Sequence, residues 1–321
     1  MESIGNPVLW SAFGGLVVVA LLIDLVLMRH GGPHRVTFRE ALLWSIGWVV
    51  LGLAFGGWLW WYETGLAGPE AGQRIALEYF TGYLVEKALA VDNIFVFLML
   101  FSYFAVPEEQ RQKVLIIGVL GAIVLRAAMI FAGALLLQQF HWILYVFGAF
   151  LLLTGAKMLW AAGKEPDLDN NPLLRWLTAH VPMTRSYVGA RLSVIEGGRR
   201  LFTPLFIVVV MVAITDVIFA VDSIPAIFAI TTDPFIVLTS NVFAVLGLRA
   251  MFFLLAGLAD RFHLLPYGLA LVLMFIGVKM LIVDLVKIPV AVSLGVVAAT
   301  IGATVVLSLL RPVVTEDTAA R

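Results

Sequence analysis

The stretch Val85-Glu-Lys-Ala-Leu-Ala-Val-Asp-Asn-Ile-Phe95 places two acids, a lysine and an asparagine in a segment that continues as the apolar run VFLMLFSYF. A charged side chain near the centre of a bilayer is costly, so such residues are rare and usually functional. The surrounding chain of 321 residues is 62% hydrophobic and only 13% charged. A soluble domain needs more polar residues than this to cover its surface. The sequence therefore predicts an all-α polytopic membrane protein, with the lipid bilayer as its first partner.

Composition also excludes several classes of function. The chain has no cysteine, which rules out disulfides, thiolate metal sites and thiol redox chemistry of its own. Its formal net charge is zero, so no basic surface indicates nucleic acid. The five histidines show no metal-binding spacing, and no cofactor motif is present. We expect neither an enzyme nor an organic cofactor, and the sequence leaves the oligomeric state open.

Nine apolar runs are long enough to span a bilayer as helices. A polar segment between them contains SYVGARLSVIEGGRRLFT, whose alternation around Gly197-Gly198 predicts a short β-hairpin. The chain accordingly divides into two peripheral spans (1–70), a first set of three (71–160), a cytoplasmic loop (161–203), a second set of three (204–285), and a last span with a cytoplasmic tail (286–321). The spans are expected at 8–28, 40–61, 79–105, 114–137, 142–160, 204–231, 236–258, 264–284 and 289–310.

The distribution of basic residues predicts the orientation of these spans. With the N-terminus outside, fourteen lysines and arginines fall in cytoplasmic segments, and only Arg74 and Lys287 fall outside. Cytoplasmic loops of membrane proteins carry such an excess of basic residues. We expect the N-terminus outside and the C-terminus in the cytoplasm.

The two sets of three spans form an internal repeat. EKALAVDNI at 86–94 aligns with DVIFAVDSI at 216–224, acid over acid and Ala-Val-Asp over Ala-Val-Asp. Because the first copy enters from outside and the second from inside, the halves are predicted to be inverted, as in many secondary transporters with ion sites near the midplane. Further pairs follow in the same order: LRA at 125–127 and 248–250, and GAKML at 155–159 with GVKML at 277–281.

The repeat also selects the candidate site. The repeated acids and the amide and hydroxyl groups beside them offer oxygen ligands, which suit hard cations such as Mn²⁺, Mg²⁺ or Ca²⁺. Four carboxylates with two arginines leave two negative charges, which one divalent cation or protons would neutralise, and buried structural ion pairs are the alternative interpretation. The candidate metal ligands are Glu86, Asp92, Asn93, Asp216, Asp222 and Ser223, with Arg126, Arg249, Asn241, Thr215 and Lys87 as possible counter-ions or supporting residues.

The spacing of the acids restricts how they meet. Glu86 and Asp92 are six residues apart, so on a regular helix their directions differ by about 240°. They share a site only if the helix is interrupted; otherwise each acid belongs to a different layer. Pro225 follows the second acid pair, so we expect local unwinding around Asp222–Pro225.

Long motifs of the chain resemble the TerC family. They include EKALAVDNIFVFLMLFSYF, the second acidic segment from ITDVIFAVDSIPAIF onward, and KMLIVDLVKIPVAVSLGVV. The resemblance covers nearly the whole chain and implies a bacterial inner-membrane protein of the lysine-exporter-like superfamily. It further implies links to manganese efflux, to tellurite resistance and alkaline pH, and, for some members, a description as redox modulators. The family's acidic positions correspond to the six candidate ligands.

Two functions remain open on this basis. The first is export of a divalent cation, with Mn²⁺ indicated by the resemblance, by alternating access with coupling to protons or membrane potential. The second is a redox-, alkaline- or tellurite-stress membrane factor without transport activity, whose acids form structural ion pairs.

Overall fold

The computed structural model describes residues 3–31, 37–140, 142–161, 175–176, 179–184, 186–196, 198–256 and 262–310. Much of the predicted loop and the tail beyond Leu310 lie outside these residues. The bounds are α1 Pro7–Gly31, α2 Phe38–Ala67, α3 Pro69–Tyr103, α4 Glu108–Gln139, α5 Ile143–Ala161, β1 Ser193–Glu196, β2 Arg199–Phe202, α7 Pro204–Phe228, α8 Pro234–Val245, α9 Leu248–Ala256, α10 Leu265–Leu281 and α11 Val290–Leu310.

The protein is an all-α polytopic membrane protein. Within the described residues, seven spans are long and apolar enough to cross a bilayer, and α8 and α9 together make one of them. The other two predicted spans correspond to α3, which carries Glu86, Lys87 and Asp92, and to α10, which has 17 residues. The predicted count of nine spans stays a prediction.

Local sequence signals explain where the helices begin. Thr37 caps α2, because its hydroxyl accepts a hydrogen bond from the Glu40 amide at 3.3 Å. The Asp233 carboxylate caps α8 by accepting from the Phe235 amide at 2.8 Å, and Pro234 occupies the first helical position.

The predicted hairpin is confirmed: β1 and β2 pair antiparallel.

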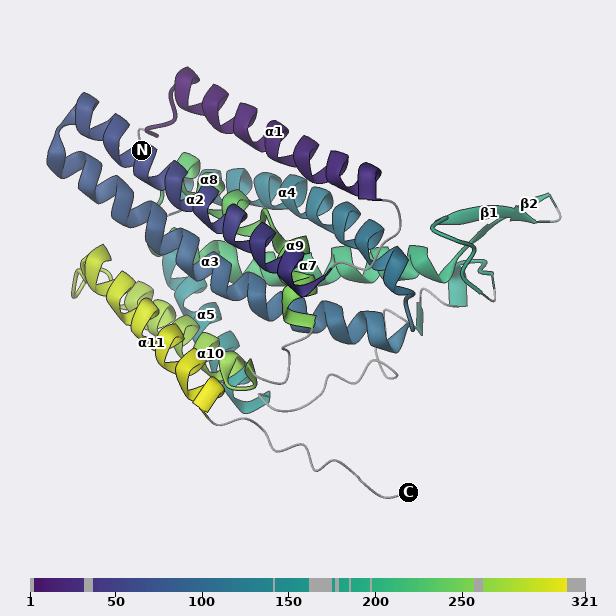
Figure 1. Cartoon of the computed structure of the whole chain (residues 1–321). Helices are drawn as coiled ribbons and strands as arrows, with labels where there is room; N and C mark the ends of the chain where they lie inside the picture. Colours follow the sequence, from purple (N-terminus) through teal and green to yellow (C-terminus); the bar gives the residue numbers. More distant parts are fainter. Residues whose placement is uncertain are drawn as a thin grey trace.

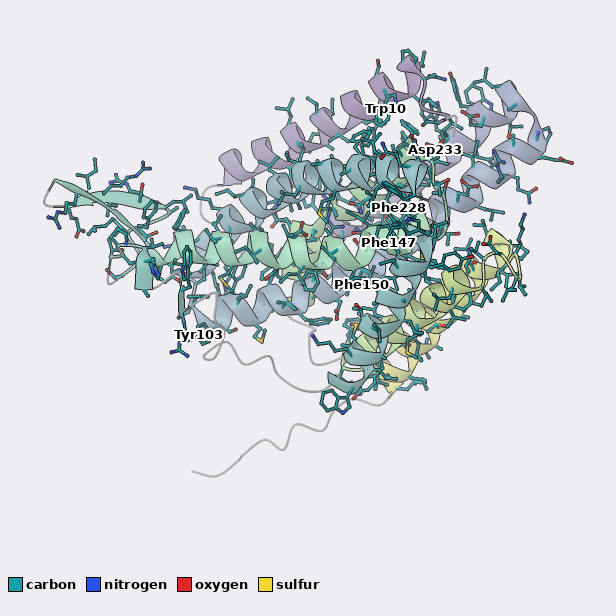
Figure 2. The ribbon with its side chains drawn as sticks, turned by 180° about the vertical axis from the view of Figure 1, so that it is seen from behind. Trp10, Tyr103, Phe147, Phe150, Phe228 and Asp233 are labelled. Atoms are coloured by element: carbon teal, nitrogen blue, oxygen red, sulfur yellow. The ribbon has the colours of Figure 1, made fainter. Side chains whose placement is uncertain are left out.

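The helices form a bundle with two distinct ends (Figure 1). The long helices α2 and α3 run side by side, α1 and α11 lie on the outside, and the hairpin projects from one end. In Figure 2, Tyr103 lies toward the hairpin end, whereas Trp10, Asp233 and Phe228 lie toward the opposite end. We call these the hairpin end and the N-terminal end.

Helices α5 and α10, equivalent members of the two repeat copies, pack on each other through glycines. A Cβ atom on Gly155 would lie 2.8 Å from the Ala270 carbonyl oxygen, and one on Gly277 would lie 2.8 Å from the Gly148 carbonyl oxygen. Gly155 is the repeat equivalent of Gly277, and Gly148 is that of Ala270. The two contacts are therefore reciprocal, as a two-fold relation between the halves requires, and they support the predicted repeat.

The expected unwinding around Asp222–Pro225 is wrong. Helix α7 continues through Pro225 to Phe228. A proline removes the hydrogen bond from its own position to the carbonyl of residue i−4, here Val221, and α7 accommodates the loss of this one bond. The interruption lies in the next span instead, where Gly247, with φ of 83°, separates α8 from α9.

Candidate functional site

The centre of the bundle holds an ion-pair cluster around Arg126 of α4. The Arg126 guanidinium donates to the Glu86 carboxylate of α3. It also donates twice to the Asp216 carboxylate of α7, from Nη2 to Oδ1 at 3.1 Å and from Nε to Oδ2 at 3.5 Å. Arg126, Glu86 and Asp216 are 1%, 0% and 4% exposed, respectively. One guanidinium thus bridges the equivalent acids of the two repeat copies.

Two neutral side chains complete this cluster. Arg126 Nη1 lies 3.4 Å from Ser223 Oγ of α7 and 3.4 Å from Asn241 Oδ1 of α8. Asp216 and Ser223 are seven residues apart, about two turns, so they share a face of α7. Four helices therefore converge on one arginine.

Buried polar atoms without partners occur in the cluster and, at Asn93, two turns from Glu86 on the same face of α3. Glu86 Oε2, Asn93 Nδ2 and Asn241 Nδ2 are buried and have no hydrogen-bond partner in the described part of the chain. An unpaired buried polar atom is destabilising, and such an atom in a native fold calls for an explanation such as a bound ion or water. Two carboxylates on one guanidinium also leave a net charge of −1 if both are ionised. The cluster is therefore suited to accept a further cation or proton.

The second acid of each copy lies apart from Arg126. Helix α3 is uninterrupted, so Asp92 points away from the face of Glu86, and the half-buried Asp92 has no ion-pair or hydrogen-bond partner among the described residues. Asp222 faces α5, where the Thr154 hydroxyl and the Lys157 ammonium lie near its carboxylate. In each copy, therefore, the first acid binds Arg126 and the second acid lies at a different place in the bundle.

The structure does not bring all six candidate ligands into one shell. No group of three or more Asp, Glu, His or Cys side chains in the described residues is arranged to hold a metal. The reason is that Arg126 occupies the space between Glu86 and Asp216. Of the predicted ligands, Glu86, Asp216 and Ser223 meet at Arg126; Asn93 is buried, while Asp92 and Asp222 lie elsewhere.

The supporting residues are also divided. Asn241 joins the cluster, and Thr215 is half-buried next to Asp216. Lys87 donates to the Ala244 carbonyl oxygen of α8 at 3.1 Å. Arg249 binds Asp24 of α1, with Nε 3.1 Å from Oδ1.

Sequence reasoning missed three of these contacts. Asp24 binds Arg249, and Lys279, which is buried, donates to Ser293 Oγ of α11 at 2.9 Å. No pattern in the sequence indicated that Thr154 lies near Asp222. The repeated Gly-x-Lys-Met-Leu motif was the available signal for Lys157 and Lys279.

Comparison with known proteins identifies the family. The profile of the "Integral membrane protein TerC family" matches residues 71–317. The chain belongs to the TerC family. The TerC profile covers every candidate residue, whereas Asp24, the partner of Arg249, lies in α1 before the matched region.

Relatives of this TerC chain extend over nearly its full length. It is 54% identical to the "Putative membrane-bound redox modulator Alx" of Salmonella typhi, over 96% of each chain. It is 56% identical to the protein of the same name from Escherichia coli K12, over 92% of each chain. An "Uncharacterized membrane protein STKORF319" of Myxococcus xanthus is 48% identical, over 96% of this chain and 94% of the relative. No solved structure matches the chain.

Proposed function

We propose that this TerC protein exports a divalent metal cation, with Mn²⁺ the first candidate, from the cytoplasm by alternating access. The observation that carries the proposal is the meeting of Glu86 and Asp216, equivalent acids of two inverted halves, in the buried centre of the bundle. Transporters built from inverted repeats bind their ions near the midplane at the interface of the halves.

The chemistry of the cluster fits a hard cation as cargo. Around the Arg126 guanidinium lie oxygens of Glu86, Asp216, Ser223 and Asn241. Mn²⁺, Mg²⁺ and Ca²⁺ all accept such ligands. The preference for Mn²⁺ comes from the family resemblance, and Mg²⁺ and Ca²⁺ remain alternatives.

The arrangement gives Arg126 the role of an internal substitute for the cargo. Without a cation, its positive charge offsets that of the two acids in an apolar environment, where uncompensated charges are strongly unfavourable. An arriving cation has to displace the guanidinium before it reaches both carboxylates. Protons on the acids, driven by the proton gradient or membrane potential, would serve the return step.

A flux measurement on purified protein in liposomes tests the proposal. Glu86→Gln and Asp216→Asn should each reduce Mn²⁺ flux by about tenfold or more, because each removes a charged ligand. The matched control is Glu70→Gln, an exposed acid in the first turn of α3. Flux of the folded Glu86→Gln and Asp216→Asn variants equal to that of the wild type would refute the proposal. Parallel measurements with Mg²⁺ and Ca²⁺ identify the preferred cargo.

The names of the relatives favour one alternative, a redox-linked membrane factor without transport activity. Since the chain has no cysteine, such a factor has to use a bound cofactor rather than its own thiols. An absorbance spectrum of the purified protein distinguishes the two functions. Haem or flavin bands at one equivalent, with no metal flux, would favour the redox factor.

A further inference from the structure

Equivalent arginines of the two repeat copies have different partners. Arg126 binds Glu86 and Asp216, whereas its equivalent, Arg249, binds Asp24 on α1, outside the repeat. Glu86 and Asp216 exchange places when one copy is superposed on the other. The repeat therefore relates Arg249 to the same acid pair, although Arg249 does not bind these acids in this structure.

The helices that carry the two arginines also differ. Helix α4 is continuous over 32 residues, but its equivalent is divided at Gly247 into α8 and α9. Val124, the counterpart of Gly247, lies within the continuous α4. At the division, Lys87 binds the Ala244 carbonyl oxygen, which the Leu248 amide would take in an unbroken helix.

The two ends of the bundle are unequal as well. At the N-terminal end, a cavity of about 390 Å³ is lined by residues including Phe228, Thr231 and Asp233. Toward the hairpin end, a cluster that includes Phe97, Phe101 and Phe252 fills the space between α3, α7 and α9. One repeat motif thus exists in two conformations.

We propose that Arg126 and Arg249 take turns as the counter-charge of the Glu86–Asp216 pair. In the second state, α8 and α9 straighten across Gly247, and Arg249 leaves Asp24 for the acids that Arg126 releases. Exchange of conformations between two inverted copies forms the same kinds of contact at the opposite end, except at Asp24, which lies outside the repeat and holds Arg249 in the present state. The inference rests on the proposed function, because it supplies the two states that alternating access requires.

Electron–electron distance measurements test this exchange, and the absence of native cysteine allows specific labelling. Nitroxide labels at Leu43→Cys on α2 and Ala256→Cys on α9 occupy exposed positions and report on straightening of α8–α9. Labels at Leu43→Cys and Tyr103→Cys, on α2 and α3, are the control pair and should keep one distance throughout.

The exchange predicts opposite effects for the two partners of one ion pair. Asp24→Asn frees Arg249. The population of molecules with the second label–label distance should therefore rise, relative to the population with the first distance, by about fivefold or more, which is the scale of an ordinary coupling between sites. Arg126→Gln should have the same effect by vacating the acids. Arg249→Gln should remove the second distance.

A static ion pair between Asp24 and Arg249 would make Asp24→Asn and Arg249→Gln behave alike, and this result would overturn the inference. If Arg126→Gln does not fold, the comparison of the other two variants still decides. The distances are measured without metal, so a shift seen without Mn²⁺ flux would support the exchange while refuting the proposed cargo. Flux with unchanged distances in all variants would refute only the exchange.

Discussion

Glu86 and Asp216 stand at equivalent positions of the two repeat copies, and both carboxylates bind the guanidinium of Arg126. The two halves are thus joined at their centre by one positive charge. Arg126 and Glu86 belong to the first copy, so the two bonds from Arg126 to Asp216 are the contacts that join the halves.

Removal of the Arg126 charge should destabilise the fold strongly. Arg126→Gln removes the counter-charge of two buried carboxylates, and breaking a buried ion pair from one side costs about 3–5 kcal/mol, of which the arrival of Arg249 would return only a part. Thermal unfolding in detergent, followed by tryptophan fluorescence, measures the loss. Neutralising all three groups, with Glu86→Gln, Asp216→Asn and Arg126→Gln together, should recover part of it.

Arg74, which lies 3.9 Å from Glu78, provides the control, because its side chain is 69% exposed. Arg74→Gln should change the unfolding free energy by about 1 kcal/mol or less. An Arg126→Gln variant as stable as Arg74→Gln would contradict a charged central cluster.

Reciprocal packing of α5 and α10 gives a second prediction. Gly155→Ala and Gly277→Ala each place a Cβ atom under 3.0 Å from backbone atoms of the partner helix, so both should separate the helices. We expect losses of about 1–3 kcal/mol in unfolding free energy, similar for the two variants. Gly121→Ala on α4, where a Cβ atom meets nothing within 4 Å, should be neutral or stabilising. Clearly unequal losses would argue against the two-fold relation.

The sequence could predict the class of fold and the members of the cluster because both follow from simple patterns. Apolar runs fix the helices, and acid over acid in the repeat selects Glu86 and Asp216. Helix geometry also separates Asp92 from Glu86, because side chains six residues apart on a regular helix point to different faces.

Partner choice and helix breaks could not be predicted in the same way. Nothing in the repeat distinguishes Arg126 from Arg249, because their difference depends on Asp24 of α1, outside the duplicated segments. Pro225 was the expected breaker, yet α7 continues through it to Phe228, and the break lies at Gly247. Such choices depend on tertiary contacts that local sequence does not encode.

The predicted orientation is testable by labelling single cysteines with a membrane-impermeant maleimide. Leu66→Cys, 65% exposed at the end of α2, should react in intact cells, because its end of the bundle is expected outside. Ile195→Cys, 78% exposed in the hairpin, should react only after the membrane is opened. The reverse pattern would invert the topology, and with it the proposed direction of export.

Lys87 should stabilise the interruption between α8 and α9. Its ammonium binds the Ala244 carbonyl oxygen, so Lys87→Met removes a charged hydrogen bond and leaves that oxygen to find another donor, at a cost of about 1–3 kcal/mol. The Leu248 amide is the nearest substitute along the chain, and we expect slower hydrogen exchange there as the helix becomes continuous. Lys113→Met, which removes an exposed bond to the Ala190 carbonyl oxygen, is the control and should leave exchange at Leu248 unchanged. Faster exchange at Leu248 in Lys87→Met would mean that the segment frays rather than straightens, and that the bend is not one of two ordered states.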